Sequence, residues 1–338
     1  MSAGYLAQVA MFATAMSLTG AAFAQTSTTA TASSTATTTA TTATAPASGE
    51  SATKLSDVTP QNTDVKKEGD VDTDEVITNR KLRAETGAKK KYSFSSAVTY
   101  SGGTINNPMS DVRPNITAGI GTQIAPRLSG SVGMKYRLSP LQTLSASVGV
   151  GVDKPFHSDD KKSFRERSSA SNPGVSYTTM YKALGIQNVS SVSASAYTTD
   201  FLRTNGYIAG FGFTQTMVYD FGGSKTSVGL SASLSTSIFD KDDARLAANQ
   251  GDYGVGAFPF FEYVINDKLN FRTLIGFMAD HSRATGDFWT WTANKVYQSA
   301  GLGISVTRDL YLYPNVQFIP EDIRADRTNV GITANINL

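Results

Sequence analysis

The sequence predicts an all-β fold: a transmembrane, antiparallel, up-and-down β-barrel of twelve strands behind a disordered N-terminal extension. Three observations lead to this prediction. From residue 91 to the C-terminus, successive segments alternate apolar with small polar residues. The connections between these segments are alternately short and long. The chain also begins with a secretory signal, so the mature protein leaves the cytoplasm.

Composition narrows the function classes. The chain has 338 residues, of which 17% are charged, and a formal net charge of +2, which argues against a nucleic-acid-binding protein. It has no cysteine, which excludes disulfides, thiolate zinc sites and a cysteine nucleophile. Beyond the signal, no run reaches the roughly 18–20 apolar residues that a membrane-spanning helix needs. We therefore expect strands to cross the membrane, and we expect neither a cofactor nor a metal.

The N-terminal quarter divides into three segments. Residues 1–24 form a signal peptide, in which an apolar run precedes the A-x-A cleavage pattern Ala22-Phe23-Ala24. Residues 25–71 are rich in Thr, Ala and Ser, then in charged residues, and form a disordered linker because they bury too little apolar area to offset their ordering entropy. Residues 72–90 form a short helix or periplasmic segment, with acids before bases as the helix dipole favours. We favour a solvated linker here over a plug or a periplasmic contact element.

Residues 91–338 carry the barrel pattern. In Ser227–Ile238, Val, Leu, Ala and Ile occupy most of the even positions, and Ser and Gly occupy all of the odd positions. A strand points successive side chains to opposite faces, so this segment has one apolar and one small polar face. The strands of a soluble β-sandwich also alternate apolar and polar residues. Here, however, the polar face is Ser, Gly, Thr and Asn rather than Lys and Glu, and the segments are long enough for tilted membrane strands.

Two of the predicted strands are unusual. The segment 114–138 is too long for one crossing, and we interpret it as a single strand that projects past the membrane. The hairpin 174–198 alternates poorly, and ten strands remain if it belongs to a loop. The predicted strands are 91–101, 114–138, 142–152, 174–184, 188–198, 206–219, 225–238, 254–265, 269–280, 294–306, 310–318 and 328–338.

On the signal, the alternation and the asymmetry of its connections, the chain resembles the Gram-negative single-chain outer-membrane β-barrels, which include porins. The resemblance covers residues 91–338 and implies an outer-membrane location, with both termini periplasmic and long loops extracellular. It also implies contact with outer-membrane lipid, lipopolysaccharide and the barrel-assembly machinery, with peptidoglycan as a candidate contact of residues 49–90. One departure is the C-terminal Leu338, where the family usually has an aromatic residue.

Charged side chains are predicted in the barrel interior. By strand parity Glu262 and Arg272 point inward, and they flank the turn at Asn266–Lys268 symmetrically, so they should face each other across the hairpin. Lys135, Arg137 and Arg127 also point inward. We favour a salt-bridge network that braces the barrel, and the alternative is an eyelet of opposed charges that sets solute selectivity.

No catalytic residue is assigned. His157 and Ser158 are adjacent, as are Asp280 and His281, so each pair would face opposite sides of a strand. There is no Gly-x-Ser-x-Gly motif and no pair of histidines at metal spacing. We therefore expect no enzymatic activity, and an outer-membrane hydrolase is the weakest of our three hypotheses.

The functional hypotheses differ in the role that they give to the barrel interior and to the long loops. A narrow passive channel for small polar solutes leads, because the inner face is small and polar. The alternative is a structural or surface-interaction barrel with a filled interior and ligand-binding extracellular loops. Its candidate contacts are Phe288, Trp289 and Trp291, for which we favour packing in an outer aromatic girdle or a loop.

Overall fold

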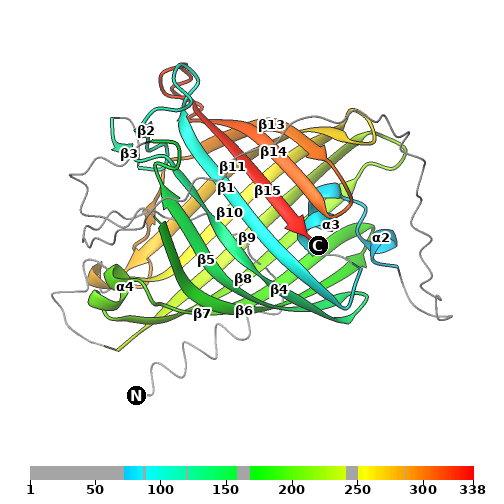
Figure 1. Cartoon of the computed structure of the whole chain (residues 1–338), viewed down its shortest axis with the longest axis horizontal. Helices are drawn as coiled ribbons and strands as arrows, with labels where there is room; N and C mark the ends of the chain where they lie inside the picture. The colour runs from blue at the N-terminus through cyan, green and yellow to red at the C-terminus, as the bar shows by residue number, and fades with distance from the viewer. Residues whose placement is uncertain (1–71, 87–88, 119–120, 158–167, 241–249, 286) are drawn as a thin grey trace, which may run out of the picture.

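The computed structural model describes residues 72–338, apart from 87–88, 119–120, 158–167, 241–249 and 286 (Figure 1). The predicted signal peptide (1–24) and the predicted linker (25–71) lie outside the described residues. No helix in the described part of the chain is long and apolar enough to cross a membrane.

The strands form one closed antiparallel barrel. Of the thirteen strands in the sheet, β12 (Thr292–Ala293) has only two residues, which leaves twelve long strands. Each long strand pairs with its neighbours in sequence, and β1 pairs with β15 to close the ring. The predicted up-and-down barrel of twelve strands is therefore confirmed. The long strands are β1 (Tyr92–Thr104), β4 (Arg127–Ser139), β5 (Gln142–Asp153), β6 (Ser168–Ala183), β7 (Ile186–Ala196), β8 (Tyr207–Asp220), β9 (Thr226–Phe239), β10 (Gly251–Val264), β11 (Leu269–Ser282), β13 (Tyr297–Ser305), β14 (Leu310–Phe318) and β15 (Asn329–Asn337).

The ten-strand alternative is wrong, because the weak hairpin forms. β6 and β7 pair continuously from Gly174 opposite Ser195 to Ala183 opposite Ile186. Leu184 and Gly185 close it with φ values of 51° and 79°, and positive φ at both central residues is the geometry that suits a right-twisted hairpin.

The prediction of one long strand over 114–138 is also wrong. β4 begins only at Arg127, and β2 (Arg113–Pro114) pairs with β3 (Gln123–Ile124) in a separate ribbon. Prolines 114 and 126 have no backbone N–H to donate to a ladder, so they interrupt the strand that the alternation of isoleucines imitates. The segment between β1 and β4 is therefore a long loop.

The two ends of the barrel differ. The short-turn end carries the connections 140–141, 184–185, 221–225, 265–268 and 306–309, together with the C-terminus. Helices α2 (Thr73–Val76) and α3 (Arg80–Thr86) lie at this end (Figure 1). The long-loop end carries the remaining connections, with α4 (Asp200–Thr204) and the 3₁₀ turn η1 (Arg283–Thr285).

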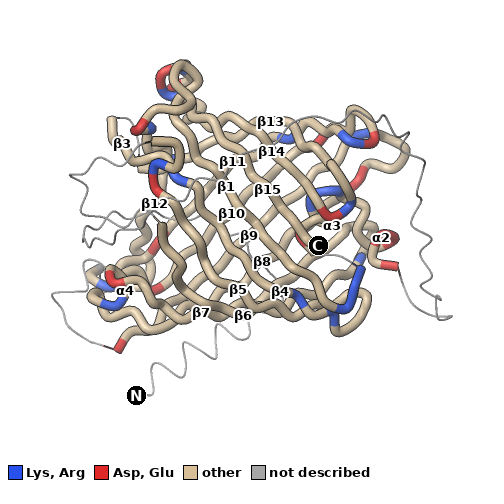
Figure 2. Tube along the Cα trace, viewed as in Figure 1, with Lys and Arg blue, Asp and Glu red and all other residues tan. Residues whose placement is uncertain are grey.

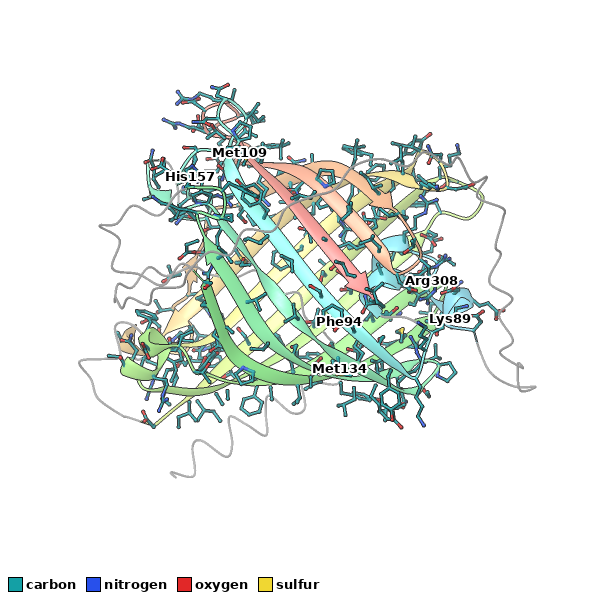
Figure 3. All side chains as sticks on the ribbon, viewed as in Figure 1. Lys89, Phe94, Met109, Met134, His157 and Arg308 are labelled. Atoms are coloured by element: carbon teal, nitrogen blue, oxygen red, sulfur yellow. The ribbon has the colours of Figure 1, made fainter. Side chains whose placement is uncertain are left out.

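The outer wall is apolar. In β11, Phe271, Ile275 and Phe277 are exposed, whereas Asn270 and Arg272 on the opposite face are buried. Exposed apolar side chains recur around the barrel, including Phe94 and Met134, which are labelled in Figure 3. Lys, Arg, Asp and Glu gather toward the two ends and leave the middle uncharged (Figure 2). An apolar band between charged ends is the surface that a bilayer requires.

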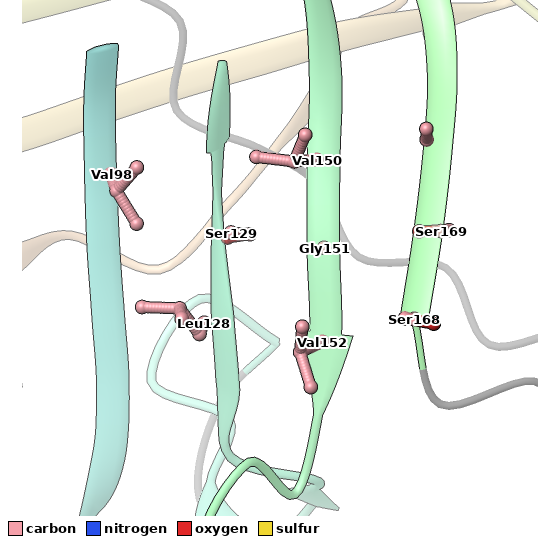
Figure 4. Close-up of a pocket in the computed structure, with 9 residues that line it drawn as sticks. Val98, Leu128, Ser129, Val150, Gly151, Val152, Ser168 and Ser169 are labelled. Carbon is pink, nitrogen blue, oxygen red and sulfur yellow. The ribbon is translucent and has the colours of Figure 1, made fainter. Parts of the chain in front are cut away.

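One depression lies in this outer wall. It has a volume of about 380 Å³ and is lined by residues of β1, β4, β5 and β6 (Figure 4). Val98, Leu128 and Val150 belong to the outward-facing positions of their strands, so the depression faces the lipid side rather than the barrel interior.

Candidate functional site: a plugged barrel interior

Residues 72–86, here called the plug segment, pack inside the short-turn end of the barrel. Ile77, Leu82 and Ala84 are 0%, 2% and 0% exposed, and α3 contacts β13, β14 and β15. The favoured sequence interpretation of this segment as a solvated linker is therefore wrong. The segment packs inside the barrel because it has a short apolar face, and this face is difficult to recognise in the sequence among the surrounding charged residues.

Apolar side chains of the barrel receive this face. Met180 of β6, Val218 of β8 and Phe260 of β10 occupy inward positions where the alternation elsewhere places small polar residues. These inward apolar residues were the available sequence signal that something apolar lies inside the barrel. They form one buried cluster with the plug segment, comprising Val76, Ile77, Leu82, Met180, Val218 and Phe260.

Polar contacts fix the centre of the plug segment to three strands. Gln187 Oε1 of β7 accepts hydrogen bonds from the backbone N–H groups of Thr78 (2.7 Å) and Asn79 (3.0 Å). Thr78 Oγ1 donates to Asp220 Oδ2 of β8 at 2.7 Å. Asn79 Nδ2 donates to Glu262 Oε2 of β10 at 2.8 Å. The barrel thus satisfies backbone donors that precede α3, which would otherwise be costly to bury.

The C-terminal end of α3 is held in the same way. The backbone carbonyl of Ala84 accepts a hydrogen bond from Asn337 Nδ2 of β15, and that of Glu85 accepts one from Lys135 Nζ of β4. The last carbonyls of a helix have no partner within the helix, so these side chains supply them. A lysine at this position also complements the negative end of the helix dipole.

An ion-pair cluster closes the outer edge of the plug segment. Arg308, in the turn between β13 and β14, donates from Nε to both carboxylate oxygens of Asp74 at 3.1 Å and from Nη2 at 2.8 Å. Lys89 Nζ lies 3.1 Å from Asp74 Oδ2 and 2.9 Å from Asp72 Oδ1. Burial alone would raise the pKa of Asp74, but its bonds to Arg308 and Lys89 outweigh burial and hold that pKa below its usual value. The carboxylates are therefore ionised wherever the cluster is formed.

The predicted inward charges separate into two groups. Glu262 and Arg272 are paired in the register, as the turn symmetry predicts, and they form a buried ion pair. Lys135 and Arg137 lie at the same end and contact the plug segment, Arg137 through Thr73 Oγ1 at 3.3 Å. Arg127 is at the long-loop end, where its Nε lies 3.3 Å from Asp153 Oδ1. The five residues therefore do not form one ring.

The opposite mouth is narrowed by the loop between β1 and β4. Arg113 Nη2 donates to Gln317 Oε1 at 3.3 Å, and Asn329 Nδ2 donates to the carbonyl of Pro114 at 2.9 Å. Gln317 and Asn329 occupy inward positions of β14 and β15. Burial lowers the pKa of Arg113 to about 10.

The predicted surface aromatics form a cluster at the long-loop end. Tyr253 stacks on His281 with ring centroids 4.2 Å apart, and its ring lies 5.0 Å from that of Trp291. Phe288 and Trp289 pack edge to face, and Trp289 is 78% exposed. These contacts hold the aromatic residues of the loop after β11 against the rim and leave the Trp289 side chain exposed.

His281 is engaged at both ring nitrogens. Its Nδ1 lies 2.7 Å from Asp252 Oδ1, and its Nε2 lies 2.7 Å from the carbonyl oxygen of Asp287. This arrangement places no serine or threonine hydroxyl on either ring nitrogen. Among the residues that the structure describes, no group of three or more His, Cys, Asp or Glu side chains is placed to hold a metal ion.

Comparison with known proteins gives structural similarities at low sequence identity. No family model and no curated protein matches the chain. The COG4313 outer membrane channel from Pseudomonas putida F1 is similar at a TM-score of 0.45 and 11% identity, covering 75% of this chain and 97% of that chain. The NanC porin gives 0.41 and 9%, covering 72% and 100%, and the KdgM porin gives 0.36 and 9%, covering 73% and 99%. Similarities this weak support no inference about the function of this chain.

Proposed function

We propose that this protein is an outer-membrane channel for small polar solutes whose periplasmic end is closed by the plug segment. The observation that carries the proposal is the closed barrel with an apolar outer wall and an inner wall of serine, threonine, glycine and asparagine. Lipid needs such an exterior, and passage of polar solutes needs such an interior. In this proposal the short-turn end faces the periplasm and the long loops face outward.

The plug segment determines how the channel behaves. Its contacts reach β4, β7, β8, β10 and β15, so it blocks much of the short-turn end rather than lying along one side. The plug segment is not a strand of the barrel sheet and is held by side-chain contacts. It can therefore detach while the twelve strands stay paired in a closed ring. We therefore expect a low conductance that rises when the segment leaves.

Single-channel recording in planar bilayers tests the proposal. We compare the full chain with a deletion of residues 72–88 and with a deletion of equal length in the preceding linker, residues 49–65. The plug deletion should raise conductance several-fold, and the linker deletion should leave it unchanged. Absence of current steps from all three proteins, each shown to be folded by heat-modifiable gel mobility, would refute the channel.

A reversible cross-link gives a second test that does not depend on a deletion. The chain has no native cysteine, so the double variant Thr78→Cys, Asp220→Cys carries a unique pair at a site where the native side chains are 2.7 Å apart. Oxidation should hold the conductance at its lowest level, and reduction should restore openings. Equal currents in both states would contradict a plug that moves.

A surface-interaction barrel is the second candidate function, and the exposed Trp289 favours it. Substituting Phe288 and Trp289 together with serine removes the exposed aromatic pair without touching the interior. If the barrel acts through its surface, cells carrying this variant lose ligand capture while channel conductance is unchanged. If the parent protein conducts and the double variant binds surface ligands as well as the parent does, the channel function is favoured.

A further inference from the structure

The charges of the barrel interior are confined to its two ends. Every inward Lys, Arg, Asp or Glu of the described strands lies within four positions of a strand end, the furthest being Lys135 in a strand that ends at Ser139. Next is Arg272, three positions from Leu269. Figure 2 shows the same division along the barrel. The middle of the interior therefore has no fixed charge.

One side of this middle section is a wall of hydroxyl groups, formed by β4 to β7. Register pairing places Ser145 opposite Ser176, and Ser176 opposite Ser193. Thr178 donates to Ser191 across the next pair at 3.1 Å. These side chains are only half-buried, so solvent reaches them. The inward residues of the wall are Ser131, Ser145, Ser147, Ser176, Thr178, Ser191 and Ser193.

The other side is filled by aromatic rings. β10, β13 and β14 lie six strands around the ring from β4, β6 and β7, and they carry Phe258, Tyr297 and Tyr313 inward. Phe258 and Tyr313 are 7% and 5% exposed. The Tyr297 ring covers Gly276, where a Cβ atom would lie 2.2 Å from it. The aromatic side thus carries bulky buried rings, whereas the hydroxyl wall carries short, half-buried side chains.

A buried hydroxyl between the two sides also lacks a partner. Thr214 of β8 occupies an inward position opposite Ser191 and is 4% exposed. Its Oγ1 has no hydrogen-bond partner among the described residues. A buried polar atom without a partner is costly, so this side of the interior is one hydrogen bond short.

From this arrangement we propose that the passage selects uncharged polyhydroxylated solutes, such as sugars and polyols, over ions of similar size. A neutral sugar exchanges its hydrogen bonds with water for bonds to serine and threonine hydroxyls at little net cost. An ion that enters the same section loses hydration and meets no opposite charge in return. The inference rests on the channel function proposed above and adds the class of solute.

Liposome swelling with solutes of one size tests the inference. The plug deletion lacking residues 72–88 is reconstituted and exposed to glucose, to sodium gluconate and to glucosamine hydrochloride. Glucose should enter about tenfold faster than either charged analogue, which corresponds to about 1.4 kcal/mol of discrimination. Equal or faster entry of gluconate or glucosamine overturns the inference.

Two variants place the selectivity in the hydroxyl wall. Ser193→Asp introduces a fixed negative charge and should speed glucosamine at least several-fold while slowing gluconate. Ser193→Asn, the matched control, has the size and polarity of Asp without its charge and should leave the ratio of the glucosamine and gluconate rates unchanged. Position 193 is half-buried, so both substitutions should be tolerated. Heat-modifiable gel mobility checks that each variant is folded. Unchanged glucosamine and gluconate rates in Ser193→Asp would show that solutes pass elsewhere, which also overturns the inference.

The outcomes separate the two proposals. If no solute enters through the folded protein, with or without the plug segment, the channel function itself fails. If charged solutes enter as fast as glucose, the channel stands and only the proposed selectivity fails.

Discussion

Replacing Asp74 with asparagine should loosen the plug segment. The substitution keeps the shape of the side chain but removes the charge that faces Arg308 and Lys89. It leaves the apolar cluster around Ile77 and Leu82 in place. The expected result is therefore a weakened attachment of the plug segment, not an unfolded barrel.

The magnitude follows from the geometry. A hydrogen bond to a charged group contributes about 1.5–3 kcal/mol net when buried, whereas an exposed ion pair contributes about 0–1 kcal/mol. The Asp74 side chain is 25% exposed and makes three contacts with Arg308, so its contribution lies between these limits. A loss of about 1–2 kcal/mol would raise the ratio of detached to docked plug about 5- to 30-fold.

Single-channel recording measures this ratio as the fraction of time spent at the higher conductance level. Asp309→Asn is the matched control, because Asp309 accepts a hydrogen bond from the same arginine at 2.5 Å but belongs to the barrel turn. If Asp74→Asn is no more open than Asp309→Asn, the ion-pair cluster does not hold the plug segment, and the reasoning is refuted.

Three further predictions concern pH and the buried contacts. Because docking lowers the pKa of Asp74 below its usual 3.8, the ionised carboxylate stabilises docking above that pH, and this contribution is lost as the pH falls further. Channel openings should therefore become more frequent below about pH 4 and stay constant from about pH 5 to 8. Equal responses to acid in Asp74→Asn and in the parent protein would contradict this prediction. Leu82→Ala should cost about 2–5 kcal/mol of plug docking, seen as faster proteolysis of the plug segment, whereas Leu82→Met, which nearly keeps the side-chain volume, should cost much less. Arg272→Leu leaves Glu262 buried without its cationic partner and should destabilise the barrel by about 3–5 kcal/mol, measured as a lower temperature of conversion in heat-modifiable gels. Adding Glu262→Gln should recover most of the loss, and an Arg272→Leu variant as stable as the parent would contradict the argument.

The barrel was predictable because its signal is periodic and long. Alternation over ten or more residues identifies a strand with one lipid face, and the symmetry of a short turn places Glu262 opposite Arg272. The error at 114–138 has the same origin. Regular spacing of isoleucines continued the pattern, and two prolines outweighed it by withholding ladder hydrogen bonds.

The plug segment was not predictable in the same way. α2 has four residues and α3 has seven, too few for a helical period to stand out against the charges around it. Its burial depends on partners far along the chain, such as Gln187 and Glu262, which no local pattern connects to residues 78 and 79. Tertiary contacts, rather than helix propensity, therefore determine its position.

The meeting of β1 with β15 makes the two ends of the fold interdependent. Leu338 exchanges backbone hydrogen bonds with Phe94, and its neighbour Asn337 holds the carbonyl of Ala84. The β1–β15 pairing and the docking of the plug segment thus depend on two adjacent residues of the same strand end. Removing β15 would leave β1 and β14 with unpaired edges and would also remove the Asn337 contact that holds α3, so the same strand joins the barrel wall and anchors its contents.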